Sequence, residues 1–160
     1  MIAGEIILAL LLVAANGFFV AVEFGIARLR PTQASEFVRS GRPGAKSVQH
    51  AVEHIDSYLS ACQLGITICS LGLGALGEPA FHDALEPLLG DAAEIAGIGL
   101  ASALAFILIT MLHVVVGELA PKSAAIARTP PIVLALTPAM RMFYFATKPI
   151  VEMQIGRAHV

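Results

Sequence analysis

The chain has 160 residues, of which 57% are hydrophobic and only 14% are charged, and its mean hydropathy is +0.80. The apolar residues form long runs instead of the amphipathic segments of a water-soluble protein, which indicates an integral membrane protein. The formal net charge is −2, and nothing in the charge pattern points to a nucleic-acid partner. We therefore predict an all-α membrane fold with three transmembrane helices.

The first predicted span covers about residues 2–27 and begins with the apolar run Ile2–Val22. This run reaches the roughly 20 residues that cross a bilayer core. A cleaved signal peptide would begin with basic residues, whereas this run carries Glu5 near its start. We therefore expect a helix that is retained in the membrane.

Two polar residues lie on one face of this span. Asn16 and Glu23 are seven residues apart, which places them on the same side of a helix. Glu23 is either a cation ligand or an interfacial residue that pairs with Arg28 or Arg30, because it is only about one turn from the end of the span. Asn16 lies deeper in the apolar run.

A polar region over residues 31–56 separates the first two spans. The turn signal Ser40–Gly44 divides this region, which predicts two short helices in a hairpin. By the positive-inside rule the connection is cytoplasmic, and the N-terminus is then outside. From Arg28 to Asp56 the connection contains five basic residues: Arg28, Arg30, Arg39, Arg42 and Lys46.

The second predicted span covers about residues 57–77 and carries a stripe of polar side chains on one face. This stripe either lines a cavity for a polar solute or supplies hydrogen bonds between helices. Its members are Ser60, Gln63, Thr67 and Ser70. Cys62 and Cys69 are about 10 Å apart along the helix axis, too far for a disulfide, so we expect them to pack as small apolar side chains.

The third predicted span covers about residues 95–117 and follows an acidic connection. Residues 78–94 contain no lysine or arginine, which suits the outer side of the membrane. His113 lies within the span and must face the interior of the bundle. A lone helix histidine is typical of a hydrogen-bonded packing residue, and without a second histidine nearby we assign it no catalytic zinc. The five acids of the connection are Glu78, Asp83, Glu86, Asp91 and Glu94.

The most informative segment, Gly-Glu-Leu-Ala-Pro-Lys-Ser at 117–123, follows this span directly. Pro121 has no N–H for the carbonyl of Gly117, so a helix that continues here must bend or widen. The Gly117 carbonyl would then be free beside the carboxylate of Glu118. A hard cation such as Mg²⁺ or Na⁺ prefers these oxygens. The alternative for Glu118 is an i,i+4 ion pair with Lys122, whose geometry the proline disturbs.

The last part of the chain is predicted to lie along the membrane surface. Residues 130–150 are apolar but contain Pro138 and Arg141, which predicts short interfacial helices and not a fourth span. The tail at residues 154–160 resembles a translated sequencing-library adapter. We therefore expect this tail to be adapter-derived and the protein to continue beyond Met153.

Three stretches together resemble the membrane domain of the cyclin M/CorC family, which includes bacterial proteins of the HlyC/CorC or hemolysin type. They are Phe18–Leu29 (FFVAVEFGIARL), Cys62–Pro79 (CQLGITICSLGLGALGEP) and Val116–Ser123 (VGELAPKS). The resemblance covers Ile2 to about Met153, and the GELAPKS block is its most specific part.

This resemblance implies three spans with an outside N-terminus in a bacterial inner membrane, a juxtamembrane helical belt and a homodimer. It also implies Mg²⁺ transport, as efflux coupled to Na⁺. A cytoplasmic CBS-domain pair that binds ATP and a CorC-type C-terminal domain would lie outside this chain. Glu118 and the Gly117 carbonyl match the family's cation site.

Three positions depart from the family pattern. Val20 replaces a serine of the first span, and Ile66 and Ser70 replace asparagines of the second, which leaves the ligand shell poorer in oxygen. The residues that could substitute as ligands are Thr67, Ser70, Gln63 and Glu23.

Three functions are compatible with these patterns. The leading one is a divalent-cation transporter. The alternative is a membrane-anchored regulatory or dimerisation module that moves no ion, while cytoplasmic domains sense nucleotide. An intramembrane hydrolase is disfavoured, because the sequence has no His-Glu-x-x-His motif and no evident nucleophile. We therefore expect no enzymatic activity.

Overall fold

The computed structural model describes residues 2–89 and 99–156, and helices are its only regular secondary structure over these ranges. Three helices are long and apolar enough to cross a membrane, which confirms the predicted fold class. The helices are α1 (Ile2–Arg28), α2 (Pro31–Arg39), α3 (Ala45–Glu53), α4 (Ile55–Leu89), α5 (Leu100–Leu112), a π-helix η2 (His113–Leu119), α6 (Ala120–Ala127) and α7 (Thr129–Gly156).

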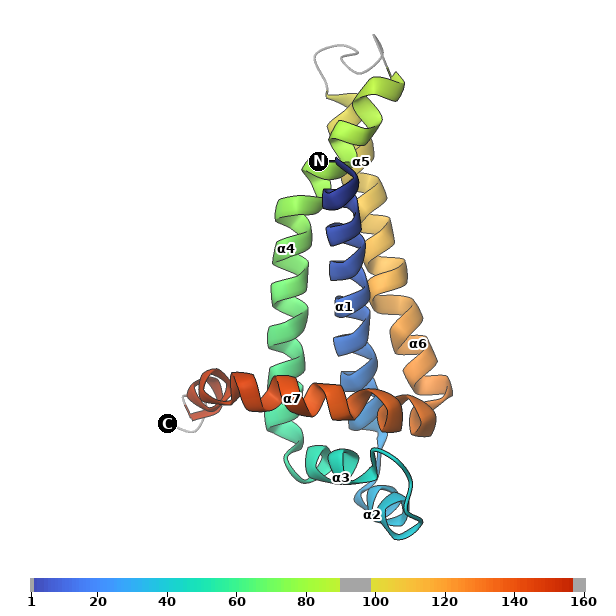
Figure 1. Cartoon of the computed structure of the whole chain (residues 1–160), viewed down its shortest axis with the longest axis vertical. Coiled ribbons are helices and arrows are strands. Elements are labelled where there is room, and N and C mark those ends of the chain that lie inside the picture. Colours follow the sequence, from blue (N-terminus) through green and yellow to red (C-terminus); the bar gives the residue numbers. More distant parts are fainter. Residues whose placement is uncertain (1, 90–98, 157–160) are drawn as a thin grey trace.

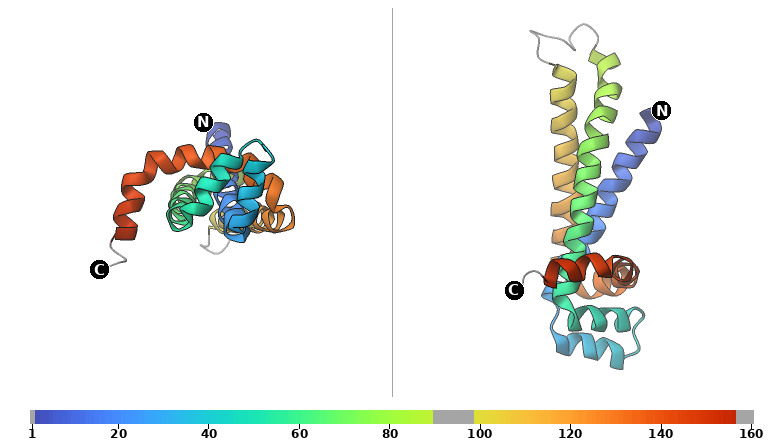
Figure 2. Two further views of the ribbon diagram at one scale, coloured as in Figure 1. Left: turned by 90° about the horizontal axis from the view of Figure 1, so that it is seen from below. Right: turned by 90° about the vertical axis from the view of Figure 1, so that its left-hand side faces the viewer.

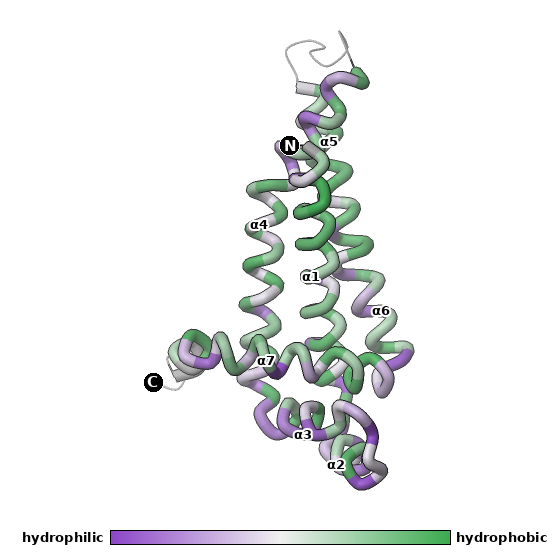
Figure 3. The backbone as a smooth tube through the Cα atoms, viewed as in Figure 1, coloured by the Kyte–Doolittle hydropathy of each residue, from purple (hydrophilic) through white to green (hydrophobic). Residues whose placement is uncertain are grey.

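The three upright elements are α1, α4 and the continuous rod formed by α5, η2 and α6 (Figure 1). Gly65 of α4 permits a close approach to α1, because a Cβ there would lie 2.6 Å from the ring of Phe19. Cys62 and Cys69 are free thiols in this packed region, which confirms that no disulfide joins them. Apolar residues cover most of the upright helices, and polar residues gather on α2 and α3 (Figure 3).

Two of the upright elements extend further than the predicted spans. α4 continues to Leu89 through Pro79 and Pro87, so the predicted outer connection at 78–94 begins inside a helix; its residues 90–94 lie outside the described part. A proline removes one helical hydrogen bond, which bends a helix without always ending it. The third helix is described from Leu100 and continues to Ala127, since the backbone widens at Gly117 and does not break.

Below the upright helices, α2 and α3 form the predicted helical hairpin (Figure 1). The connecting turn contains Gly41 and Gly44, both with positive φ (66° and 79°), a conformation that favours glycine. Gly44 lies against the carbonyl of Leu134 in α7, and Phe37 and Val48 are buried in the same contact. The hairpin is therefore packed directly on α7.

α7 lies across the lower ends of the upright helices, and seen from below it curves around them (Figure 2). The predicted short helices at 130–150 are in fact one helix of 28 residues, with Pro138 and Pro149 inside it. Burial of one face explains its continuity, because Met140, Tyr144 and Val151 pack in the core cluster around Tyr58. Its location at a membrane surface stays a prediction.

Candidate functional site

The candidate site is built around the widened turn of the third upright helix. Residues 113–119 form a π-helix, which confirms that the helix widens where Pro121 cannot donate to Gly117. The N–H of Ala120 instead donates to the carbonyl of Val115, five residues earlier. The Gly117 carbonyl is therefore available to a group outside its own helix.

That group is Asn16 of α1. Its Nδ2 donates to the Gly117 carbonyl over 3.0 Å, so this oxygen is not free, as the sequence had led us to expect. The approach requires Gly17, because a Cβ there would lie 2.9 Å from Cγ of Pro121. Asn16 is 1% exposed, and its Oδ1 has no hydrogen-bond partner among the described residues.

Sequence reasoning noted that Asn16 is deep in its span but did not assign it to the site. The sequence did carry a sign of this contact. The amide of Asn16 inside an apolar run needs a hydrogen-bond partner, and Pro121 in another span releases the Gly117 carbonyl. What the sequence lacked was the pairing of the two helices.

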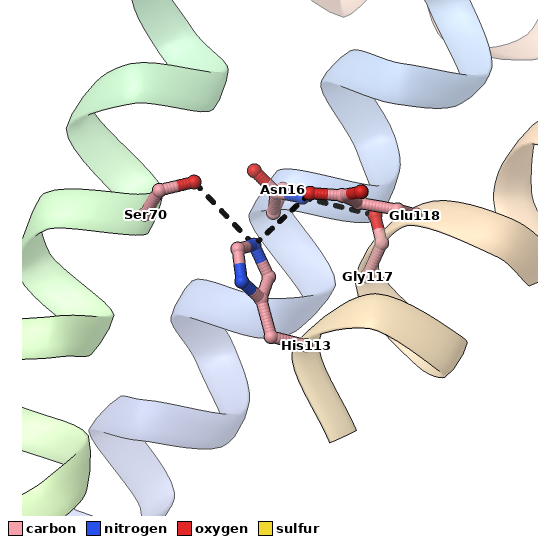
Figure 4. Close-up of polar contacts among 5 residues, drawn as sticks. All are labelled: Asn16, Ser70, His113, Gly117 and Glu118. Carbon is pink, nitrogen blue, oxygen red and sulfur yellow. Dashed lines mark hydrogen bonds and ion pairs between the residues drawn. The ribbon is translucent and has the colours of Figure 1, made fainter. Parts of the chain in front are cut away.

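Three further side chains meet beside this amide, from α4 and from the widened turn (Figure 4). Nε2 of His113 lies 3.4 Å from Oγ of Ser70 and 3.8 Å from Oε1 of Glu118. His113 therefore faces the bundle interior, as predicted, and links α4 to Glu118. His113 is therefore the partner of Glu118, as an ion pair when the imidazole is protonated, while Nζ of Lys122 lies 4.4 Å from the ring centroid of Phe24.

A pocket of about 290 Å³ opens on the hairpin side of Glu118. Glu23 lines this pocket, where its carboxylate is hydrogen-bonded to Gln63 of α4 and lies close to Lys122 of α6. These two residues, and not Arg28 or Arg30, are the polar neighbours described for Glu23. Two of the three departures from the family pattern, Val20 and Ile66, are also in the wall of this pocket. The lining residues are Val20, Glu23, Phe24, Ile66, Glu118, Leu119 and Lys122.

A smaller pocket of about 140 Å³ lies on the other side of His113, between α4 and α5. Its polar lining consists of Ser70, Glu78, Thr110 and His113. The Ser70–His113 contact therefore borders this pocket, while Glu118 faces the one below. Both pockets are small enough for an ion with a few water molecules.

The structure brings only some of the proposed ligands together. Gly117, Glu118 and Ser70 lie in one cluster, and Glu23 and Gln63 lie beside the lower pocket. Thr67 has no contact with either group among the interactions of the described residues; its hydroxyl donates to the Gln63 carbonyl of its own helix over 2.8 Å. Among the described residues there is also no group of three His, Cys, Asp or Glu side chains that could hold a metal. Any cation here must therefore use amide, hydroxyl or backbone oxygens as well.

Comparisons with known proteins give one consistent assignment. Residues 6–157 match the family described as the cyclin M transmembrane N-terminal domain. The chain is 41% identical to the UPF0053 protein YhdT of Bacillus subtilis, over 98% of this chain and 34% of that protein. It is 39% identical to YrkA of the same organism, over 96% and 36%, and 31% identical to sll0260 of Synechocystis, over 92% and 33%. The chain thus spans about a third of the length of these relatives.

Proposed function

Because this chain belongs to the family of cyclin M transmembrane N-terminal domains, we propose that it is the membrane domain of a divalent-cation transporter. In this proposal two copies form a homodimer that moves Mg²⁺ across the membrane, as efflux coupled to Na⁺. CBS domains that bind ATP, and a CorC-type domain, would belong to the remaining two thirds of the whole protein.

The observation that carries the proposal is the position of Glu118 on a widened turn inside a long helix, directly after its apolar run. The turn places a carboxylate between two pockets and beside a backbone carbonyl that its own helix does not use. A carboxylate at this depth is costly unless it faces a partner or a water-filled cavity, so such residues commonly mark ion pathways. Carboxylate and carbonyl oxygens are also the ligands of hard cations.

The loop charges support one orientation. The basic hairpin would lie in the cytoplasm, and α7 would form a belt at the cytoplasmic surface of a bacterial inner membrane. The lower pocket, with Glu23 and Glu118, would then face the cytoplasm, and the N-terminus would be outside. No enzymatic step is part of the proposal.

One observation favours the alternative of a regulatory module that moves no ion. Val20 and Ile66 make part of the wall of the lower pocket apolar, at the positions where an oxygen-rich site would offer ligands. Mg²⁺ requires near-octahedral oxygen coordination and tolerates such losses poorly.

Flux measurements test the two functions. The full-length protein would be reconstituted in vesicles, and Mg²⁺ movement would be followed for the unmodified protein, for Glu118→Gln and for Glu86→Gln. Glu86 is an exposed carboxylate of α4 and serves as a matched control. Transport predicts flux that Glu118→Gln abolishes and Glu86→Gln preserves. Equal flux from all three proteins would refute a role for Glu118, and no flux from any of them would favour the regulatory module.

A further inference from the structure

Glu78 of α4 is a carboxylate that lies well inside the apolar part of the bundle. Its neighbour Gly77 packs on α5, since a Cβ at Gly77 would lie 2.9 Å from Cγ1 of Ile109. Ile109 is about 13 Å along α5 from Leu100, further than a glutamate side chain reaches, and α5 carries no charged residue. Phe81, almost one turn further along α4, packs against the apolar cluster that joins α1 to α5. Glu78 is therefore at the depth of membrane-spanning segments.

The carboxylate of Glu78 has no polar partner in the part of the chain that the structure describes. No hydrogen bond or ion pair joins it to a residue in 2–89 or 99–156. A carboxylate at membrane depth is costly unless it faces a partner, an ion or a water-filled cavity. Lipid tails offer it no hydrogen bond, so the space that it lines must hold water or a cation.

That space is the smaller pocket of about 140 Å³ between α4 and α5, which we call the upper pocket. Its other polar residues are Ser70, Thr110 and His113. Nε2 of His113 lies 3.4 Å from Oγ of Ser70, at the wall of the upper pocket, and 3.8 Å from Oε1 of Glu118 (Figure 4). The imidazole of His113 therefore separates the upper pocket from Glu118.

We propose that the upper pocket is the part of the ion path beyond His113, and that Glu78 is a second cation-binding carboxylate on this path. The inference rests on the proposed transport function and extends it past Glu118. Mg²⁺ gives up its water reluctantly, keeps several water molecules and is commonly bound through one or two carboxylates. One carboxylate, two hydroxyls and room for a few water molecules supply this mode of binding.

Thiol labelling of the full-length protein tests whether water and cations enter the upper pocket. Thr110→Cys places a thiol in the pocket, and Ile107→Cys places one on the outer face of the same helix, where Ile107 is 57% exposed. The protein is held in vesicles with its N-terminal side towards the bath. Two membrane-impermeant reagents, one cationic and one neutral, are added to the bath. Mass spectrometry reads each position separately from the native thiols Cys62 and Cys69.

We expect Thr110→Cys to be labelled at least about tenfold faster than Ile107→Cys, because only the first thiol meets water. Addition of Glu78→Gln should slow the cationic reagent by about tenfold and leave the neutral reagent unchanged, since a carboxylate in a cleft concentrates cations. Mg²⁺ at constant ionic strength should slow the cationic reagent only while Glu78 is present. Equal labelling at the two positions overturns the inference, as does a rate that neither Glu78→Gln nor Mg²⁺ changes.

Flux measurements separate this inference from the transport proposal. In vesicles, Glu78→Gln should lower Mg²⁺ flux by about tenfold, whereas Glu86→Gln, in an exposed carboxylate of the same helix, should preserve it. Flux that Glu118→Gln abolishes and Glu78→Gln leaves unchanged overturns the inference while transport stands. Protection of Thr110→Cys by Mg²⁺ in a protein that shows no flux supports the cation site at Glu78 and contradicts transport.

Discussion

Replacement of Gly17 by alanine tests whether the contact between α1 and the widened turn holds the site together. The new Cβ would lie 2.9 Å from Cγ of Pro121, whereas carbon atoms in contact prefer about 3.5–4.0 Å. The two helices must therefore separate by roughly 0.5–1 Å. The same displacement lengthens the 3.0 Å hydrogen bond from Asn16 to Gly117 towards or beyond the limit of a useful bond.

The expected cost is the sum of two effects. Overpacking destabilises by about 1–3 kcal/mol, and a weakened hydrogen bond by up to about 1 kcal/mol. The higher helix propensity of alanine offsets up to about 1 kcal/mol of this loss. Gly74→Ala is the matched control, because it makes the same substitution in α4 where no atom lies within 4 Å of the new Cβ.

The chain supplies its own probe of unfolding. It has no tryptophan, but Cys62 and Cys69 are free and buried, so a thiol-reactive dye reports the temperature at which the core opens. We expect Gly17→Ala to unfold several degrees below the unmodified protein and Gly74→Ala at or above it. If the two variants unfold at the same temperature, the close contact of Gly17 with Pro121 does not limit the packing, and the reasoning is wrong.

Three further predictions address other parts of the chain. Gly44→Ala should lower the unfolding temperature more than Gly41→Ala. Both glycines have positive φ, but only Gly44 lies against the Leu134 carbonyl. Equal losses of unfolding temperature would contradict the packing of the hairpin on α7. Burial lowers the pKa of His50 from its ordinary value of 6.5, and the positive charges of His54 and Arg141 lower it further. The contribution of the neutral His50 side chain to stability is therefore present above about pH 6.5 and is lost as the pH falls through the lowered pKa. Thermal unfolding between pH 8 and pH 5 should therefore show a smaller loss for His50→Gln than for the unmodified protein, and identical pH profiles would refute this. Val20→Ser combined with Ile66→Asn should increase the affinity of the purified protein for Mg²⁺, because the two changes add oxygen donors to the wall of the lower pocket, and an unchanged affinity would refute this.

The sequence predicts the parts of this fold that depend on local chemistry. Apolar runs of bilayer length identify the three upright helices, and the Ser40–Gly44 turn identifies the hairpin. Pro121 predicts the distortion at Gly117, because a missing N–H acts on the carbonyl four residues earlier wherever the helix lies. These signals do not depend on which helices become neighbours.

Other parts could not be predicted, since they depend on tertiary contacts. Nothing local pairs Asn16 with Gly117, which are 101 residues apart, or brings Glu118 within 3.8 Å of His113. The polar stripe of the second span illustrates the same limit. Ser70 contacts His113 of the third upright helix, whereas the hydroxyl of Thr67 donates to its own helix, although both belong to one predicted face.

The π-helix also has a consequence for insertions and deletions. A π turn closes its hydrogen bonds one residue later than an α turn, so His113–Leu119 holds one residue more than an α-helix of the same rise requires. Deletion of one residue there can be accommodated by closure to α geometry, which leaves the packed faces of α5 and α6 in place. The same deletion within Leu100–Leu112 would rotate one part of the rod against the other by about 100°. The third span thus has one position at which its length can change without loss of packing, and that position holds Glu118.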